Sequence, residues 1–217
     1  MTNIKKVLIM GGTGDIGRAI AKKFPPNITQ ILGSKDVDLS SNESIEKFFI
    51  NNKNNYEKFI FASGVNNPSP INTSSSEDFN YTMQVNCSSV HYIFTRNYKC
   101  FKNLRSFVAI GSLYSSIARL NRSSYTSSKH ALSGLVKSLA IELAPNCNVN
   151  MISPGFIKTD MTDNIGDDFR ASLIAKIPSG DLGTGQDIAN CAAFLSSDMA
   201  DYITGETIHV NGGMYMS

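Results

Sequence analysis

A tyrosine and a lysine four positions apart could perform acid–base chemistry in this chain of 217 residues. Apolar residues recur at helical spacing after Tyr125 and Lys129, so both side chains should project from one face of a helix. A phenol has a pKa near 10 in water, and a fixed ammonium beside it favours the phenolate. The pair could therefore give or take a proton near neutral pH, which is the chemistry of carbonyl reduction.

A serine upstream supplies a hydroxyl that could act together with this pair. Ser112 follows the apolar run 107–110 and precedes Tyr125 by 13 positions (125 minus 112). The chain has a second pair of the same spacing, Tyr98 and Lys102, but the equivalent upstream position is the apolar Val85. Without a nucleotide site elsewhere in the chain, Tyr125 would be read as an ordinary half-buried helix tyrosine.

A glycine-rich turn predicts that nucleotide site. The apolar run 7–10 leads directly into Gly11-Gly12-Thr13-Gly14-Asp15-Ile16-Gly17, and a helical pattern follows. Backbone N–H groups at such a helix start bind pyrophosphate, and the glycines let the phosphates approach. The alternative is a tight turn without a ligand. The cofactor-binding residues predicted here are Gly11, Thr13, Gly14, Asp15, Ile16 and Gly17.

The residues after the second apolar run indicate which dinucleotide binds. An acidic side chain at this point bonds a ribose 2′-hydroxyl, whereas Ser, Lys or Arg accommodates a 2′-phosphate. Ser34 and Lys35 come first and Asp36 only afterwards. We therefore favour NADP, with NAD bound through Asp36 as the alternative; Lys35 as a solvated surface lysine is a further reading.

Strands and helices alternate along the chain. Apolar runs predict strands at 7–10, 28–32, 36–40, 58–64, 107–110, 148–152 and 206–210. A long helix should begin near Ser76 and carry Asn86 among apolar residues, where its amide must be paired or face a wet cavity. This alternation predicts a doubly wound parallel sheet that binds ligands at the carboxyl ends of its strands.

Composition points to one domain that acts on small molecules. Twenty basic and 18 acidic residues give a net charge of +2, so neither a nucleic acid nor a membrane partner is predicted. The 4 cysteines lack metal-ligand spacing, so no metal site is predicted. Free thiols and the absence of a signal pattern or a long apolar run favour the cytoplasm.

The segment 156–185 has scattered apolar residues in a polar background and is predicted to be a substrate lid. Met161, Ile165 and Phe169 would form an apolar wall. Arg119 and Arg122 could receive an anionic group or face solvent, and solvent is the favoured reading for both.

These motifs occur in the order and spacing of a known family. They comprise the glycine turn 11–17, the Val85-Asn86 pair, Ser112, Tyr125 with Lys129, the run 154–159, the segment 178–189 and the ending 203–213. In this respect the chain resembles the classical short-chain dehydrogenase/reductase family over almost its whole length. The resemblance implies one Rossmann-fold domain over residues 1–217, with about seven strands. It also implies a homodimer or homotetramer that pairs through helices around 76–101 and 123–145.

The resemblance also implies a role for each matching residue. Tyr125 would be the catalytic acid/base, Lys129 would lower its pKa and hold the nicotinamide ribose, Ser112 would bind the substrate carbonyl, and Asn86 would position a water for proton relay. The remaining cofactor contacts would come from Asp38 and Leu39 at the adenine, Ala62, Ser63 and Gly64 at a ribose, and Pro154, Gly155, Ile157 and Thr159 at the nicotinamide. Leu113, Tyr114, Phe156 and Met161 would contact substrate.

Two departures from the family pattern stand out. Asp15 occupies the usual place of the second motif glycine, while Gly14 falls where the extended subfamily has it. Only 88 residues (217 minus 129) follow Lys129, too few for the extra substrate domain of that subfamily. The second departure is Ala62-Ser63-Gly64 in place of Asn-Ala-Gly, which loses a sheet-bracing amide.

The leading hypothesis is a reductase that moves hydride from NADPH to a ketone or aldehyde. A cofactor-dependent binding or sensing protein without catalysis is the main alternative, and a nucleotide-sugar epimerase or dehydratase is a third. Retention of Asn86, Ser112, Tyr125 and Lys129 argues against the sensor, which needs a nucleotide site but no proton relay.

Overall fold

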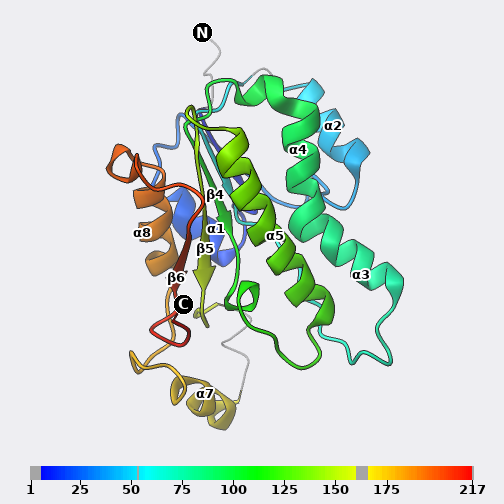
Figure 1. The fold of residues 1–217 in the computed structure, drawn as a ribbon, viewed down its shortest axis with the longest axis vertical. Helices are drawn as coiled ribbons and strands as arrows, with labels where there is room; N and C mark the ends of the chain where they lie inside the picture. Colours follow the sequence, from blue (N-terminus) through cyan, green and yellow to red (C-terminus); the bar gives the residue numbers. More distant parts are fainter. Residues whose placement is uncertain (1–5, 53, 160–165, 217) are drawn as a thin grey trace.

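One parallel sheet of six strands organises the part of the chain that the structure describes (Figure 1). The structure is a computed structural model, and it describes residues 6–52, 54–159 and 166–216. The strands run in the order β2-β1-β3-β4-β5-β6, and every neighbouring pair is parallel. They are β1 (Val7–Met10), β2 (Thr29–Leu32), β3 (Lys58–Phe61), β4 (Ser106–Ile110), β5 (Asn148–Pro154) and β6 (Thr207–Val210).

Helices cover both faces of the sheet, as the doubly wound prediction requires. The helices are α1 (Asp15–Ala21), α2 (Asn42–Ile50), α3 (Ser76–Met83), α4 (Ser89–Asn97), α5 (Ser123–Glu142), α7 (Asp167–Ile174) and α8 (Gly185–Leu195). Helices α1 and α8 lie on one face, and α2, α4 and α5 lie on the other (Figure 1). Within the described ranges, no helix combines the length and the apolar character that crossing a bilayer would need.

Alternate side chains of the central strands feed two separate cores. In β1, Leu8 and Met10 pack with α2, α4 and α5, whereas Val7 and Ile9 pack with α1 and α8. All four side chains are buried. This two-sided burial explains why the strand is a continuous apolar run rather than an alternating one.

The strand predicted at 36–40 is wrong, so the sheet has six strands rather than about seven. Asp36 closes a turn directly after β2: its backbone N–H donates to the Gly33 carbonyl at 3.0 Å, and its carboxylate accepts from the Gly33 N–H at 2.7 Å. Val37 and Leu39 are buried in the core from this turn. Their alternation with polar residues imitates a strand, but the side-chain to backbone bonds of Asp36 favour a turn.

One predicted helix differs in detail from the structure. The helix expected from Ser76 is capped by Ser75, whose hydroxyl accepts from the Asp78 N–H at 3.0 Å. It continues as a π-helical turn at Gln84–Ser88 before α4 begins. Such turns occur mostly within α-helices and frequently at functional sites, and this one contains Asn86.

The strand order also defines where a ligand can bind. Strand β1 pairs with β2 on one side and with β3 on the other, so the chain leaves β1 in opposite directions. In open parallel sheets, ligands bind in the crevice at the carboxyl ends of the strands at such a switch point. The glycine turn 11–17 begins at that end of β1.

Candidate active site

The predicted catalytic residues meet at the carboxyl edge of the sheet. Ser112 follows β4, while Tyr125 and Lys129 lie in the first turns of α5. Lys129 is only 3% exposed, and its ammonium donates to the Ile110 carbonyl at 3.0 Å. The same nitrogen lies 5.7 Å from the ring centroid of Tyr125. The side chain of Ser112 is a hydrogen-bond partner of the Tyr125 phenol.

Local hydrogen bonds hold Ser112 in place. Its hydroxyl accepts from the Tyr114 N–H at 3.2 Å, and its own N–H donates to the Ser115 hydroxyl at 3.1 Å, which forms a capping box. The Ser153 hydroxyl, from β5, donates to the Ser112 carbonyl at 2.6 Å. Ser112 is thereby fixed by the turn that follows it and by β5, so its hydroxyl can serve as an oriented partner for an oxygen atom.

Burial controls the acid–base properties of both ionisable residues. The pKa of Tyr125 is raised, because burial outweighs the hydrogen bond from Ser112 and the positive charge of Arg122. The lowered phenol pKa expected from the sequence is therefore not what this structure shows. Burial also lowers the pKa of Lys129 to about 8. A phenol with a raised pKa stays protonated at neutral pH, which suits a proton donor.

Asn86 braces the site through its side chain. Its amide nitrogen donates to the Val65 carbonyl and to the Ser128 hydroxyl, each at 2.9 Å, and its oxygen accepts from the Val65 N–H at 2.8 Å. The residue is fully buried. The amide is paired, as predicted for a buried polar residue, and it ties the loop after β3 to α5. A Cβ at Gly64 would lie 3.3 Å from the Lys129 ammonium, so this loop also closes on the lysine.

A cavity of about 250 Å³ opens beside these residues at the switch point. It is lined by predicted residues from three strand ends: Gly11, Thr13, Gly14, Ser34, Asp38, Leu39, Ala62, Ser63 and Gly64. Sequence reasoning missed its other walls, which are Met10, Leu32, Gly33, Val37, Val65, Tyr81 and Val85. Apolar Val37 in a polar run was a usable signal, whereas nothing in the sequence marks Tyr81.

Three of the cofactor-binding residues predicted in the glycine turn do not line this cavity. Ile16 belongs to α1 and packs, partly buried, against the core on that face of the sheet. A Cβ at Gly17 would lie 2.0 Å from the Gly11 carbonyl oxygen, so Gly17 allows the helix to contact the turn. Asp15 pairs with Arg18 and lines a neighbouring cavity of about 410 Å³, together with Thr159. This cavity adjoins the glycine turn on the side of the segment after β5.

Asp36, through which NAD would bind in the alternative reading, has a structural role. The Asp36 carboxylate accepts the Gly33 N–H, as described above, and Asp36 is not among the described residues that line the cavity, whereas Ser34 and Asp38 are. The carboxylate of Asp38 accepts the N–H and the hydroxyl of Ser40 at 2.9 and 2.7 Å, and these bonds lower its pKa. The side chain of Lys35 is exposed and does not line the cavity.

The segment after β5 is held against the rest of the site by backbone contacts. Pro154 ends β5, and the Gly155 N–H donates to the Val210 carbonyl at 3.0 Å, beside β6. Ile157 forms a parallel bridge with Gly183. Of the predicted substrate wall, Met161, Ile165 and the side chain of Phe169 lie outside what the structure describes. Within the predicted lid, the structure places helix α7.

The substrate side differs from the sequence reading at the arginines. Leu113, Tyr114 and Phe156, which are predicted to contact substrate, line a pocket of about 200 Å³. Arg119, for which solvent was favoured, also lines it and donates to the Tyr114 hydroxyl at 2.9 Å. Arg122 is half-buried, and its positive charge acts on the Tyr125 phenol. Arg119 is exposed, as the favoured reading has it, but it also lines the pocket, whereas Arg122 is not fully open to solvent.

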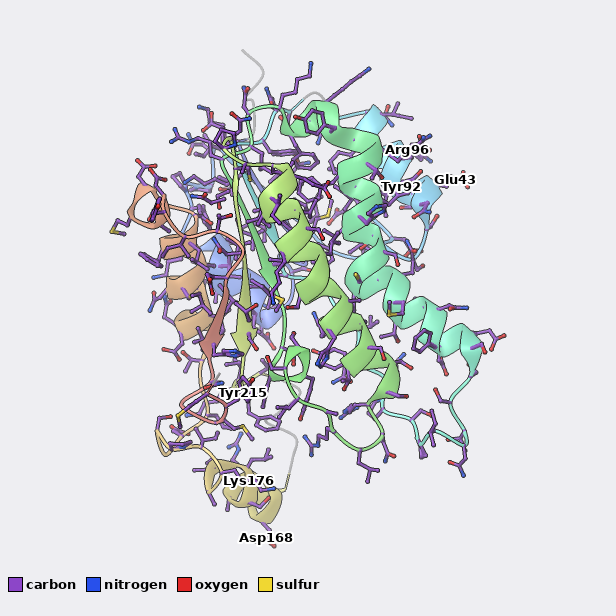
Figure 2. All side chains as sticks on the ribbon, in the orientation of Figure 1. Glu43, Tyr92, Arg96, Asp168, Lys176 and Tyr215 are labelled. Atoms are coloured by element: carbon purple, nitrogen blue, oxygen red, sulfur yellow. The ribbon has the colours of Figure 1, made fainter. Side chains whose placement is uncertain are left out.

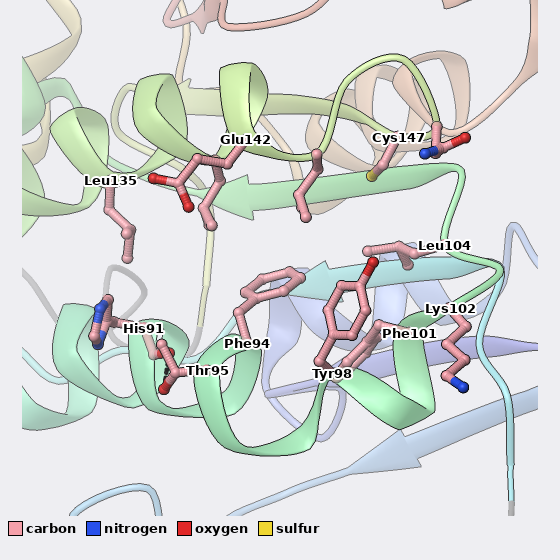
Figure 3. Close-up of a pocket in the computed structure, with 13 residues that line it drawn as sticks. His91, Phe94, Thr95, Tyr98, Phe101, Lys102, Leu104, Leu135, Glu142 and Cys147 are labelled. Atoms are coloured by element: carbon pink, nitrogen blue, oxygen red, sulfur yellow. Dashed lines mark hydrogen bonds between the residues drawn. The ribbon is translucent and has the colours of Figure 1, made fainter.

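A larger cavity of about 450 Å³ lies at the opposite edge of the sheet, between α4 and α5 (Figure 3). Leu104 and Cys147, which precede β4 and β5, are among its walls, together with Phe94 and Tyr98. None of the predicted site residues lines it. Its volume exceeds that of the cavity at the switch point, but the chemistry lies elsewhere.

Comparisons with known proteins agree with this geometry. The family model described as enoyl-(acyl carrier protein) reductase matches residues 14–215. A curated relative, the 3-oxoacyl-(acyl-carrier-protein) reductase FabG of Salmonella typhimurium, is 35% identical over 98% of this chain and 91% of its own.

Solved structures show the same fold over nearly the whole chain. A short-chain dehydrogenase/reductase from Brucella melitensis, titled a glucose/ribitol dehydrogenase, has a TM-score of 0.87 and 27% identity, covering 98% of this chain and 97% of its own. A putative 2-deoxy-D-gluconate 3-dehydrogenase from Agrobacterium tumefaciens, solved with bound NADP, has a TM-score of 0.85 and 27% identity, covering 97% and 96%. The chain therefore belongs to the classical short-chain dehydrogenase/reductase family of NAD(P)-dependent oxidoreductases.

Proposed function

We propose that this protein reduces a ketone or an aldehyde to an alcohol with hydride from NADPH, and that Tyr125 donates the proton. The observation that carries the proposal is the meeting of Ser112, Tyr125 and Lys129 at the sheet edge that also holds the glycine-lined cavity. The FabG relative, named as a reductase of a 3-oxoacyl group, supports a ketone substrate.

The lining of the cavity at the switch point would suit the adenosine and phosphate part of a dinucleotide. Gly11, Gly14 and Gly64 line it, so no side chain at these positions obstructs the backbone, and Gly14 is the N-cap of α1, whose first N–H groups favour a phosphate. When bound, the nicotinamide would supply the hydride. Lys129 and the backbone around Gly64 would hold its ribose, and the segment Pro154 to Thr159 would support the ring.

Three side chains would perform the chemistry on the carbonyl. Ser112, whose backbone is fixed by Ser115 and Ser153, would donate its hydroxyl hydrogen to the carbonyl oxygen. Tyr125 would give its proton to that oxygen as the carbonyl carbon gains hydride, which leaves an alcohol and a phenolate. The Lys129 ammonium would stabilise this phenolate, and solvent would return the proton. Because the side chain of Asn86 is bonded to Val65 and Ser128, we assign to it the positioning of this relay.

We propose NADP rather than NAD. Ser34 lines the cavity, the neighbouring Lys35 is exposed and could reach a 2′-phosphate, and the Asp36 carboxylate bonds its own turn. The Agrobacterium neighbour with bound NADP supports the same choice. Asp38 remains the acidic residue that could accept a ribose hydroxyl, and it would contact the adenosine in either case.

Purified protein titrated separately with NADPH and NADH, then incubated with a panel of ketones and aldehydes, tests the proposal. We expect tighter binding of NADPH and loss of nicotinamide absorbance with at least one carbonyl compound. Binding without consumption of any panel member would instead favour the sensor. No binding of either dinucleotide would mean that the turn with Asp15 does not hold a cofactor.

We further propose that subunits pair through the face formed by α4 and α5. Tyr98 and Ile141 leave 55% and 81% of their surface exposed on this face, and the cavity of Figure 3 opens between the two helices. A homodimer or homotetramer would cover this apolar surface. One domain over residues 1–217 and a cytoplasmic location stay predictions.

A further inference from the structure

An apolar pocket with positive charges lies next to the proposed catalytic residues. The side pocket, as we call it, has a volume of about 200 Å³ and is lined by Leu113, Tyr114, Ile117, Ala118, Arg119, Phe156, Leu173, Lys176 and Met214. Leu113 and Tyr114 directly follow Ser112 in the chain. The ring of Tyr114 meets that of Tyr125 edge to face, with 6.1 Å between their centroids. A substrate that reaches Tyr125 would therefore extend into the side pocket.

Arg119 is held in this pocket by two aromatic residues. Its guanidinium donates to the Tyr114 hydroxyl at 2.9 Å and lies 5.8 Å from the ring centroid of Phe156. Neither contact neutralises the positive charge, and one hydrogen bond leaves further N–H donors available. An arginine oriented in this way matches the geometry of a carboxylate, which can accept two parallel N–H bonds.

Lys176 adds a second positive charge from the segment after α7. Figure 2 labels Lys176 on the side of α7 nearer the sheet, whereas Asp168 lies at the outer edge of that helix. Among the side chains that the structure describes, no Asp or Glu lines the side pocket, and neither Arg119 nor Lys176 has an ion-pair partner. Both cations are exposed, so an anion can reach them from solvent, while the apolar residues of the lining leave them as the charged groups of the pocket.

We propose that the substrate of this enzyme is a short carbonyl compound with a carboxylate a few bonds from the carbonyl, and that Arg119 and Lys176 bind this carboxylate. The inference rests on the proposed function, because it places the substrate carbonyl at Tyr125. A pocket of this volume accommodates a chain of a few carbon atoms. The apolar walls would contact the chain, and the two cations would select against uncharged analogues.

Matched pairs of acid and ester test this assignment. Acetoacetate is compared with methyl acetoacetate, and 4-oxopentanoate with methyl 4-oxopentanoate, in steady-state reduction by NADPH. We expect kcat/KM to favour the acid at least tenfold in at least one pair. The difference should arise mainly in KM, because the carboxylate is bound in the ground state and in the transition state alike.

Variants of the two cations identify the source of the preference. Arg119→Gln and Lys176→Gln should each raise KM for the acid about tenfold or more and leave the ester unchanged. Arg119→Lys keeps the charge without the planar fork and should recover part of the loss. Arg96→Gln is the matched control: Arg96 lies on α4, at the opposite end of the molecule from Lys176 (Figure 2), and should have no effect.

A binding measurement separates this inference from the proposed function. The four compounds are titrated calorimetrically into protein that holds NADP⁺, which cannot reduce them. We expect an acid to bind more tightly than its ester. Arg119→Gln should abolish this difference. Such binding without turnover by NADPH would support the anion site and contradict the reductase. Turnover or binding with no acid preference in either pair, or a preference that both Gln variants retain, would overturn the anion site alone.

Discussion

Three side chains carry the proposed chemistry, and sequence spacing predicted that they would meet. Ser112, Tyr125 and Lys129 lie together because β4 ends and α5 begins at the same edge of the sheet. Spacing could not predict the direction of the tyrosine pKa. That direction depends on how deeply the phenol is buried, which is a property of the packed site.

The burial of Lys129 has a measurable consequence for stability. Its pKa falls from 10.5 to about 8 on folding, so between these values the unfolded chain retains a proton that the folded protein has released. This group therefore makes the protein more stable as pH rises through that window. We expect Lys129→Met to remove a rise on the order of 3 kcal/mol in the free energy of unfolding between about pH 8 and pH 10.5.

Urea unfolding of the ligand-free protein at pH 7, 8, 9 and 10 measures this effect. The difference between wild type and Lys129→Met isolates the lysine from the cysteines and tyrosines, which titrate in both proteins. A difference that stays constant with pH would show that Lys129 has an ordinary pKa in the folded state. The proposed role of Lys129 at the cofactor is tested with the same variant. Lys129→Met should weaken NADPH binding and should also lower turnover.

Lys35 tests the choice of dinucleotide at the level of one contact. A charge-assisted bond to a 2′-phosphate contributes about 1.5–3 kcal/mol, so Lys35→Gln should lower kcat/KM for NADPH by roughly 10- to 100-fold. NADH lacks that phosphate and serves as the internal control. Equal losses with the two cofactors, or none with either, would assign Lys35 to the solvated surface.

At the level of elements, the cofactor site depends on the close packing of α1 against the glycine turn that follows β1. A Cβ on Gly17 would lie 2.0 Å from the Gly11 carbonyl oxygen and 2.6 Å from the Gly12 Cα, and these backbone atoms cannot move aside cheaply. Overpacking of this kind costs roughly 1–3 kcal/mol. We expect Gly17→Ala to lower Tm by roughly 3–10 °C and to weaken NADPH binding.

Gly14→Ala is the matched control for this prediction. Gly14 has a φ of −77°, and its added Cβ would come no closer than 3.6 Å to another atom, so stability should change by no more than about 0.5 kcal/mol. Differential scanning calorimetry of both variants makes the comparison. Equal melting temperatures for Gly17→Ala and wild type would contradict the close packing of α1 on the turn.

Most elements could be predicted from the sequence because their patterns are local. Apolar runs predicted five of the six strands with both ends correct to within two residues. The sixth, predicted at 58–64, ends earlier in the structure, as β3 at Phe61. The pattern at 36–40 failed because Asp36 satisfies the turn with its side chain. The π-helical turn around Asn86 and the position of Tyr81 depend on tertiary contacts, which a local pattern does not contain.

At the scale of the whole molecule, the fold gathers residues that are far apart in sequence. Arg119 and Lys176 line one pocket although 57 positions separate them (176 minus 119), because α7 lies below the carboxyl edge of the sheet (Figure 1). The sequence offered Arg119 as a candidate for an anionic group but could not show that it lines a pocket. Its place in the pocket depends on the Tyr114 and Phe156 contacts seen in the structure.

Assembly is the other property of the whole molecule that can be measured directly. Light scattering should give two or four times the chain mass of 23.6 kDa. Ile141→Glu places a charge on the proposed α4–α5 interface, so it should shift the protein toward the monomer. Met199→Glu, at a residue that is 76% exposed on a different segment, is the control. A monomeric wild type, or an unchanged mass for Ile141→Glu, would contradict pairing through this face.

The most direct test of the central claim compares wild type with Tyr125→Phe in the presence of NADPH and the responsive carbonyl compound. The substitution removes the proton donor and leaves the ring against Tyr114. We expect turnover to fall by about 10²- to 10⁴-fold. The Kd for NADPH should stay within about threefold of wild type, which is a difference in binding free energy below about 1 kcal/mol. Turnover retained by Tyr125→Phe would contradict the claim that this phenol supplies the proton.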